Sequence, residues 1–129
     1  MLFPNVPFEL APELEEIDFG DFEGKTYQEL SGLPEYQKWI DSNGRRPFPG
    51  GESLDAFAAR SYGAFAKAVA EYGANPPVVL VCHGGSIMAI LSRLTGREYF
   101  SFQVPPAAGF EVAVEVSGED VRFISYRRV

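Results

Sequence analysis

The spacing of apolar side chains predicts one long amphipathic helix in the middle of the chain. Side chains suited to a buried face recur three and four residues apart at Leu54, Phe57, Ala58, Ser61, Tyr62, Phe65, Val69 and Tyr72. Ser53 is placed to cap this helix, Asp55 suits the positive end of its dipole, and Gly73 is placed to end it. We therefore expect a helix between Ser53 and Gly73, with Phe57, Tyr62 and Phe65 in the core.

A different pattern follows this helix. Residues 76–82, PPVVLVC, are β-branched and apolar on both faces, which is typical of a strand buried in a parallel sheet. Apolar residues return with helical spacing after His83 and two glycines, so a second helix should begin near Ser86 and end at Gly96. The turn between strand and helix carries the only histidine of the chain.

The chain ends in a predicted antiparallel hairpin. Residues 110–128, FEVAVEVSGEDVRFISYRR, alternate with period two around the turn residues SGED. The register that follows pairs Val116 with Val121, Glu115 with Arg122, and Val114 with Phe123.

The N-terminal part is less regular. Three prolines break residues 1–24 into extended chain, in which residues 6–10, VPFEL, form at best a short edge strand. Two short helices follow, one in TYQEL with Thr26 as its N-cap and one in LPEYQKWID with Pro34 in its first turn. Residues 42–53, SNGRRPFPGGES, are rich in turn formers and predict a loop. The order of elements predicts an α/β fold.

Length and composition indicate a single domain over residues 1–129 and argue against several classes of protein. The chain has no apolar run long enough to cross a membrane, no basic leader with a cleavage site and no low-complexity tract. Cys82 has no internal disulfide partner, which fits a reducing compartment, so we expect a cytoplasmic protein. One histidine and one cysteine argue against an all-protein zinc site, and we expect no metal and no cofactor.

The net charge of −7 argues against a nucleic-acid surface, because phosphate backbones are held by clustered Lys and Arg, which are few and scattered here. Small anionic substrates remain possible where donors cluster locally.

His83 lies at the kind of junction where small anions bind. Where a parallel strand ends, the next helix points unpaired N–H groups at the crevice. Gly84 and Gly85 let the backbone approach a phosphate or carboxylate, and the helix beginning near Ser86 adds its positive dipole. His83 can donate to an anionic oxygen or take part in proton or phosphoryl transfer. The alternative is a tight turn with a structural histidine. A serine-hydrolase role for Ser86 fails, because the nucleophile elbow needs G-x-S-x-G and the only histidine lies three residues earlier.

Charged residues in two loops are the other candidates. Residues 14–24, LEEIDFGDFEG, carry five carboxyl groups between apolar residues, and one held in a dry crevice can act as general acid to a leaving alcohol. A solvated acidic loop is the alternative. Arg45 and Arg46 either contact an anionic substrate or are solvated surface.

Three motifs, in this order and spacing, resemble those of the histidine phosphatase superfamily: LEEIDFGDFEGKTYQEL, PGGES followed by Arg60, and VVLVCHGGSIMAILSRLTG. That superfamily contains cofactor-dependent phosphoglycerate mutases and alpha-ribazole phosphatases, and this chain is similar to the latter branch. The resemblance implies a three-layer α/β sandwich of the phosphoglycerate mutase type with a mainly parallel sheet, acting on a small phosphorylated metabolite. It also implies that His83 is the second histidine of the site, bonding the transferred phosphoryl group, and that Glu16 is the general acid.

The chain departs from the family pattern at its start. Family members begin with a strand that carries the nucleophilic histidine in an Arg-His-Gly motif, and a later arginine helps to clamp the phosphate; both are absent here. Judged by βα units of about 30 residues, roughly 60 residues of the family pattern are missing. The resemblance implies that the strand at residues 78–82 then lies beside an empty slot, whose unpaired backbone groups are costly if buried. We expect the slot to be filled by a complementing chain, by a second copy in a homodimer, or by pairing of this strand with the hairpin.

Two functions from different classes remain open. One is phosphomonoester hydrolysis or phosphoryl transfer through a phosphohistidine, for which this chain alone lacks the nucleophile and is inactive or strongly impaired. The other is a non-catalytic dimeric interaction module or a small-anion-binding module that uses the HGGS turn.

Overall fold

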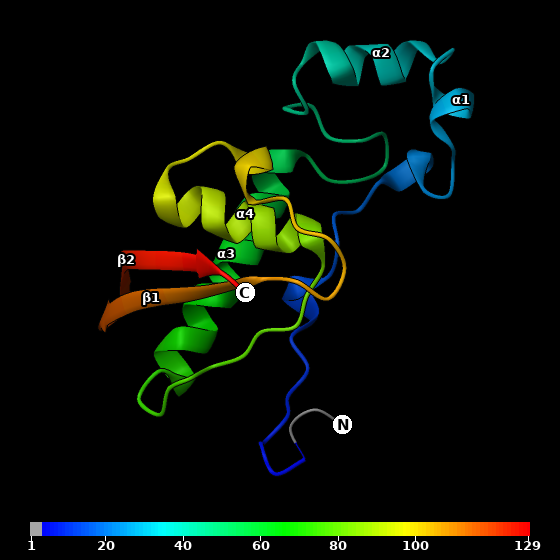
Figure 1. Cartoon of the computed structure of the whole chain (residues 1–129). Helices are drawn as coiled ribbons and strands as arrows, with labels where there is room; N and C mark the ends of the chain where they lie inside the picture. Colours follow the sequence, from blue (N-terminus) through cyan, green and yellow to red (C-terminus); the bar gives the residue numbers. More distant parts are fainter. Residues whose placement is uncertain (1–3) are drawn as a thin grey trace.

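The computed structural model describes residues 4–129, which form a central pair of helices with a helical arm on one side and a β-hairpin on another (Figure 1). The central helices are α3 (Leu54–Tyr72) and α4 (Gly84–Thr95), and the arm carries α1 (Tyr27–Leu30) and α2 (Pro34–Asp41). The hairpin consists of β1 (Phe110–Ser117) and β2 (Asp120–Arg128). Three short 3-10 turns complete the structure: η1 (Pro12–Leu14), η2 (Gly20–Phe22) and η3 (Tyr99–Phe102).

The helix ends are fixed by the residues that the sequence indicated. The Thr26 side chain accepts from the Glu29 N–H, and the Glu29 carboxylate accepts from the Thr26 N–H, which makes a capping box for α1. Pro34 is the first residue of α2. Ser53 caps α3 by accepting from the Ala56 N–H. Helix α4 begins at Gly84, two residues earlier than expected, and ends where Gly96 adopts a left-handed φ of 72°.

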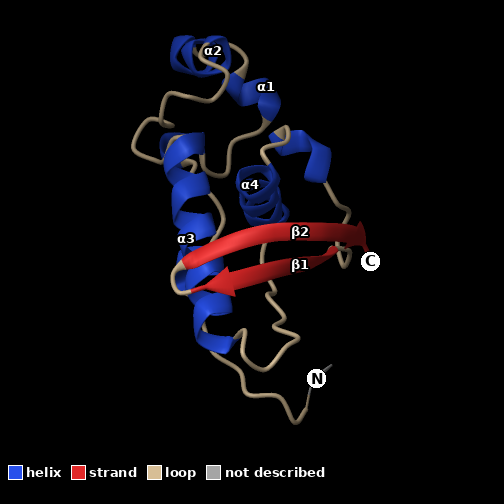
Figure 2. Ribbon diagram, turned by 90° about the vertical axis from the view of Figure 1, so that its left-hand side faces the viewer, coloured by secondary structure: helices blue, strands red, loops and turns tan. Residues whose placement is uncertain are grey.

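The hairpin has the predicted register, with Val116 opposite Val121, Glu115 opposite Arg122 and Val114 opposite Phe123. Figure 2 shows it lying across one side of the helix pair. Val114 and Val121 on its inner face pack against a core cluster of Leu14, Phe65, Val69 and Ile90. Burial of this apolar surface joins the hairpin to α3 and α4.

The predicted parallel strand at residues 76–82 is not formed. The antiparallel pair β1–β2 is the only sheet in residues 4–129, so the expected mainly parallel sheet is absent from these residues. Residues 78–82 do not pair with the hairpin or with any other strand among them. Leu80 and Cys82 pack on the core, whereas Val79 and Val81 are 55% and 88% exposed. An apolar run becomes a strand only when a second strand supplies hydrogen-bond partners, and none is present beside it.

Two other expectations concern the chain's N-terminal part and membranes. Residues 7–11 have no regular secondary structure, so VPFEL is not an edge strand; residues 1–3 of the predicted extended segment lie outside the described part. Among the described residues, no helix is both long enough and apolar enough to cross a bilayer.

Candidate functional site

His83 lies directly before α4 and is exposed to solvent. Its carbonyl accepts the first backbone hydrogen bond of the helix, which the Ile87 N–H donates at 3.1 Å. The backbone N–H groups of Gly84, Gly85 and Ser86 precede that bond and have no acceptor within residues 4–129. Together with the positive end of the helix dipole, they form the kind of helix start that binds anions, and His83 is the N-cap residue of this helix.

Glu16 is brought to this same turn from the N-terminal part of the chain. A Cβ atom placed on Gly85 would lie 2.3 Å from Oε1 of Glu16, so the carboxylate lies directly against the Gly85 backbone. The same oxygen accepts from the Ile17 N–H at 2.9 Å, which fixes the orientation of the side chain. A side chain larger than hydrogen at position 85 would push the carboxylate away. The glycine therefore permits the approach of the acid to the helix start.

Arg60 of α3 holds the main chain that carries Glu16. Its Nη1 donates to the carbonyls of Glu13 at 2.7 Å and Glu15 at 3.1 Å, and its Nη2 donates to the carbonyl of Glu16 at 3.3 Å. The guanidinium also forms a two-bond ion pair with the carboxylate of Glu52, at 2.9 Å and 2.8 Å. These bonds hold the pKa of Glu52 below and that of Arg60 above their ordinary values. We call these contacts of Arg60 and Glu52 the Arg60 brace.

Ser86 holds the same segment from the side of α4. Its side chain is fully buried, and its hydroxyl donates to the carbonyl of Leu14 at 3.1 Å. The Ser86 hydroxyl is therefore already used inside the core. What Ser86 offers to an anion is its backbone N–H.

Arg45 and Arg46 lie in the turn that follows α2 and are exposed. The Arg46 N–H donates to the side chain of Ser42, and Arg46 shares a surface hollow with Lys38 and Asp41. No hydrogen bond or ion pair within residues 4–129 joins either arginine to His83. Of the predicted site residues, the structure brings together Glu16, His83, Gly84, Gly85 and the backbone of Ser86, and leaves the two arginines on the arm.

Two residues that the sequence analysis did not place at the site, Tyr99 and Cys82, are affected by the charge of Glu16. The Tyr99 hydroxyl donates to the Gly85 carbonyl at 3.3 Å, and burial, helped by the charge of Glu16, raises the pKa of Tyr99 to about 12. Burial also raises the pKa of the Cys82 thiol, with a smaller contribution from Glu16. Both side chains are therefore neutral near pH 7. Their place in η3 and before α4 follows from tertiary packing, for which the sequence pattern has no signal.

The chain matches known proteins along nearly its whole length. The sequence model of the family described as "Histidine phosphatase superfamily (branch 1)" matches residues 3–124. The crystal structure of "a putative alpha-ribazole-5'-P phosphatase" from Escherichia coli is similar with a TM-score of 0.70 at 22% identity, over 92% of this chain and 60% of that chain. The alpha-ribazole phosphatase from Shigella flexneri gives a TM-score of 0.69 at 25% identity, over 93% and 60%.

A curated relative gives a similar picture. The "Putative phosphoserine phosphatase 2" of Hydrogenobacter thermophilus is 28% identical over 85 residues, which is 64% of this chain and 41% of that protein. The chain thus spans less than two thirds of the relatives' length. The structures support an α/β fold of the phosphoglycerate mutase type.

The contact between Glu16 and Gly85 makes a matched pair of substitutions informative. In Gly85→Ala, the new methyl group should displace the flexible carboxylate of Glu16 and break its bond to the Ile17 amide, with little change in stability. Gly84→Ala is the control, because a Cβ there meets nothing within 4 Å. The amide resonance of Ile17 should move in Gly85→Ala only. Equal shifts in both variants would contradict this placement of Glu16.

The Arg60 brace predicts a specific pH dependence of stability. Because the folded-state pKa of Glu52 lies below its ordinary value of 4.5, its stabilisation is complete above that value and is lost as the pH falls through the folded pKa. Glu52→Gln should lower the free energy of unfolding by about 1–2 kcal/mol at pH 7, and the difference from the unmodified protein should shrink below pH 4.5.

Urea unfolding at a series of pH values measures this difference. Glu35→Gln is the control, because Glu35 pairs with Lys38 on the exposed surface and its loss should matter less. A difference for Glu52→Gln that does not change with pH would contradict the brace.

Proposed function

This chain belongs to the histidine phosphatase superfamily, branch 1, and we propose that it carries the phosphate-binding and proton-donating half of a phosphomonoesterase site. The observation that carries the proposal is the contact of the Glu16 carboxylate with Gly85, directly after His83 at the start of α4. A phosphate held there would lie between an imidazole, free backbone N–H groups and a carboxyl group. The ligand class is a small phosphorylated metabolite or phosphate itself.

Each residue has a distinct role in this proposal. The phosphoryl oxygens accept from the N–H groups of Gly84, Gly85 and Ser86 and from the His83 ring. Protonated Glu16 gives its proton to the alcohol oxygen as the ester P–O bond breaks, so the alcohol leaves neutral. Arg45 and Arg46 would serve at most as distant cations that attract the anionic substrate.

The nucleophile is the group that this chain does not supply. In the proposed reaction, a second imidazole attacks phosphorus, a P–N bond forms as the P–O bond breaks, and water later cleaves the P–N bond. The one histidine here is His83, which we assign to phosphate binding. We propose that the 129-residue chain binds phosphomonoesters, turns them over negligibly alone, and gains a nucleophile from a complementing chain.

A second candidate function is a dimeric anion-binding module, and the open edge at residues 78–82 favours it. Val79 and Val81 expose large apolar surface on a segment whose backbone pairs with no other strand in residues 4–129. Two copies that pair across this segment would cover it and supply the missing ladder. We place either function in the cytoplasm, on the ground that Cys82 has no disulfide partner within the chain, and in one domain over residues 1–129.

Phosphate binding is tested by the ring resonances of the single histidine. Inorganic phosphate should shift them in a saturable way, and Gly84→Asp should weaken binding about tenfold, because its carboxylate opposes the anion at the helix start. Gly63→Asp, which adds the same charge on an exposed face of α3, is the control. Phosphate without effect on His83 would overturn the proposed site. In parallel, the unmodified protein should release no more 4-nitrophenol from 4-nitrophenyl phosphate than His83→Ala does, and hydrolysis that His83→Ala abolishes would overturn the proposal that the chain alone turns such esters over negligibly.

Dimerisation is tested by sedimentation over a range of concentrations. The protein should self-associate, and Val81→Lys should return it to the monomer, because a charge on the pairing edge opposes strand addition. Ile124→Lys, on an exposed position of β2, is the matched control and should leave association unchanged. A protein that stays monomeric throughout, or two variants that behave alike, would contradict pairing at this edge.

A further inference from the structure

Helix α4 begins with two glycines in succession, so the directions of its first N–H groups depend on contacts from elsewhere in the chain. Gly84 and Gly85 are the first two residues of the helix, and glycine has more backbone freedom than any other residue. Donors are most effective toward a charged group when they are already ordered before that group arrives. A contact that orders this turn therefore bears directly on how tightly it holds an anion.

The peptide unit between Gly85 and Ser86 is held by two side chains. The Tyr99 hydroxyl donates to the Gly85 carbonyl at 3.3 Å, and the buried Ser86 hydroxyl donates to the Leu14 carbonyl at 3.1 Å. A carbonyl oxygen has two lone pairs, so Gly85 can accept from Tyr99 as well as from the helix N–H four residues further on. In a planar trans peptide, the C=O and N–H bonds point in opposite directions. Fixing the Gly85 carbonyl therefore fixes the direction of the Ser86 N–H.

Tyr99 is suited to this contact because its hydroxyl stays protonated. Burial, with a smaller contribution from the charge of Glu16, raises the pKa of Tyr99 to about 12, so the phenol is a neutral donor near pH 7. Hydrogen bonds in a chain polarise one another, so donation to the Gly85 carbonyl strengthens the N–H of the same peptide unit as a donor. The neutral phenol also adds no negative charge at a turn that would bind an anion.

The segment that carries Tyr99 is held in turn by the end of the hairpin. Arg128 of β2 donates to a main-chain carbonyl of η3 at 3.2 Å and to the carbonyl of the residue that follows η3 at 3.0 Å. Phe102 of η3 is 1% exposed and meets the rings of Phe110 and Tyr126 edge-on. The place of the Tyr99 hydroxyl therefore depends on β1 and β2.

We propose that Tyr99 is a positioning residue of the anion site, which acts through the Gly85 carbonyl to direct the Ser86 N–H at the bound phosphate. This inference rests on the proposed function and adds to it a residue from η3. The C-terminal hairpin contributes to phosphate affinity through Arg128, because Arg128 keeps η3, and with it the Tyr99 hydroxyl, in place.

The substitution Tyr99→Phe removes the hydroxyl and keeps the ring. Inorganic phosphate is titrated while two signals are followed: the ring resonances of His83, which report binding, and the amide resonance of Ser86, which reports the state of that donor. Tyr99→Phe should raise the dissociation constant of phosphate about threefold, the size expected for one hydrogen bond that acts indirectly. It should also move the Ser86 amide resonance of the free protein and reduce its response to saturating phosphate.

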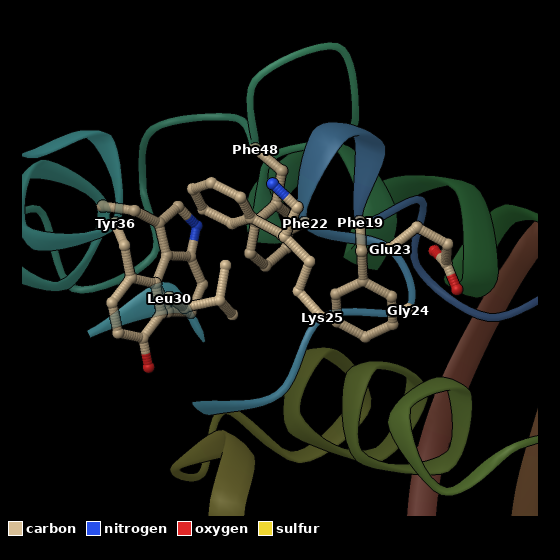
Figure 3. Close-up of a pocket in the computed structure, with 9 residues that line it drawn as sticks. Phe19, Phe22, Glu23, Gly24, Lys25, Leu30, Tyr36 and Phe48 are labelled. Carbon is tan, nitrogen blue, oxygen red and sulfur yellow. The ribbon is translucent and has the colours of Figure 1, made fainter. Parts of the chain in front are cut away.

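Two other tyrosines provide matched controls. Tyr126→Phe removes a hydroxyl that accepts from Arg97 at 2.8 Å, so this variant also loses a hydrogen bond. Tyr36→Phe removes a hydroxyl on the arm, where Tyr36 lies in the wall of a hollow lined by aromatic rings (Figure 3). Neither control should change the phosphate affinity or the Ser86 amide. A loss of affinity in Tyr126→Phe equal to that in Tyr99→Phe would overturn the positioning role, because it would follow from lost stability alone.

A double-mutant cycle tests the contribution of the hairpin. Arg128→Met should raise the dissociation constant of phosphate about twofold, and it should add nothing in the Tyr99→Phe background, because its effect passes through the Tyr99 hydroxyl. Arg127→Met is the control, since it removes the same charge from an exposed pair with Glu111. Arg128→Met alone, with the same two signals, replaces Tyr99→Phe if that variant does not fold.

The outcomes separate this inference from the proposed function. If Tyr99→Phe binds phosphate as tightly as the unmodified protein and the Ser86 amide does not move, the positioning role is overturned and the proposed function stands. Equal losses from Arg128→Met in both backgrounds would overturn the contribution of the hairpin through Tyr99. If phosphate leaves the His83 resonances of the unmodified protein unchanged, the proposed function itself fails.

Discussion

The site depends on the hydrogen bonds that Arg60 donates to the main chain of residues 13–16. The Arg60 guanidinium donates hydrogen bonds to three carbonyl oxygens of an irregular segment and is neutralised by Glu52. On the other side of this segment, the Ser86 hydroxyl donates to the Leu14 carbonyl. Carbonyls in such a segment have no ladder or helix to satisfy them, so side chains of α3 and α4 do so. As a result the Glu16 carboxylate lies against Gly85, two residues after His83, although Glu16 and this turn come from opposite halves of the chain.

The same architecture leaves one edge of the molecule incomplete. The segment before His83 is apolar enough for the inside of a sheet, yet its alternate valines face solvent and its backbone pairs with no strand in the described residues. The chain covers 60% of the length of the alpha-ribazole phosphatase structures that it resembles. We propose that the helix start after His83 and the unpaired segment before it belong to a protein that works with a partner strand.

The sequence predicted the parts of this fold that depend on local rules. Thr26, Ser53 and Gly96 mark helix ends through hydrogen bonds and backbone angles that those residue types favour. Alternation around the SGED turn gave the hairpin register. The sequence failed where the outcome depends on what lies alongside. An apolar β-branched run indicates burial and cannot indicate whether a second strand is there to pair with it. Likewise, nothing in the sequence around Ser86 shows that its hydroxyl turns inward to Leu14, nor that Arg60 reaches back to three carbonyls.

The most direct measurement is a crystal structure of the protein with bound phosphate. We predict an anion at the start of α4 that accepts from the main-chain N–H groups of Gly84 and Gly85, with the imidazole of His83 and the carboxyl group of Glu16 both within hydrogen-bond distance of it. A phosphate held by Arg45 and Arg46 on the arm, with the start of α4 empty and Glu16 turned away from Gly85, would contradict this placement.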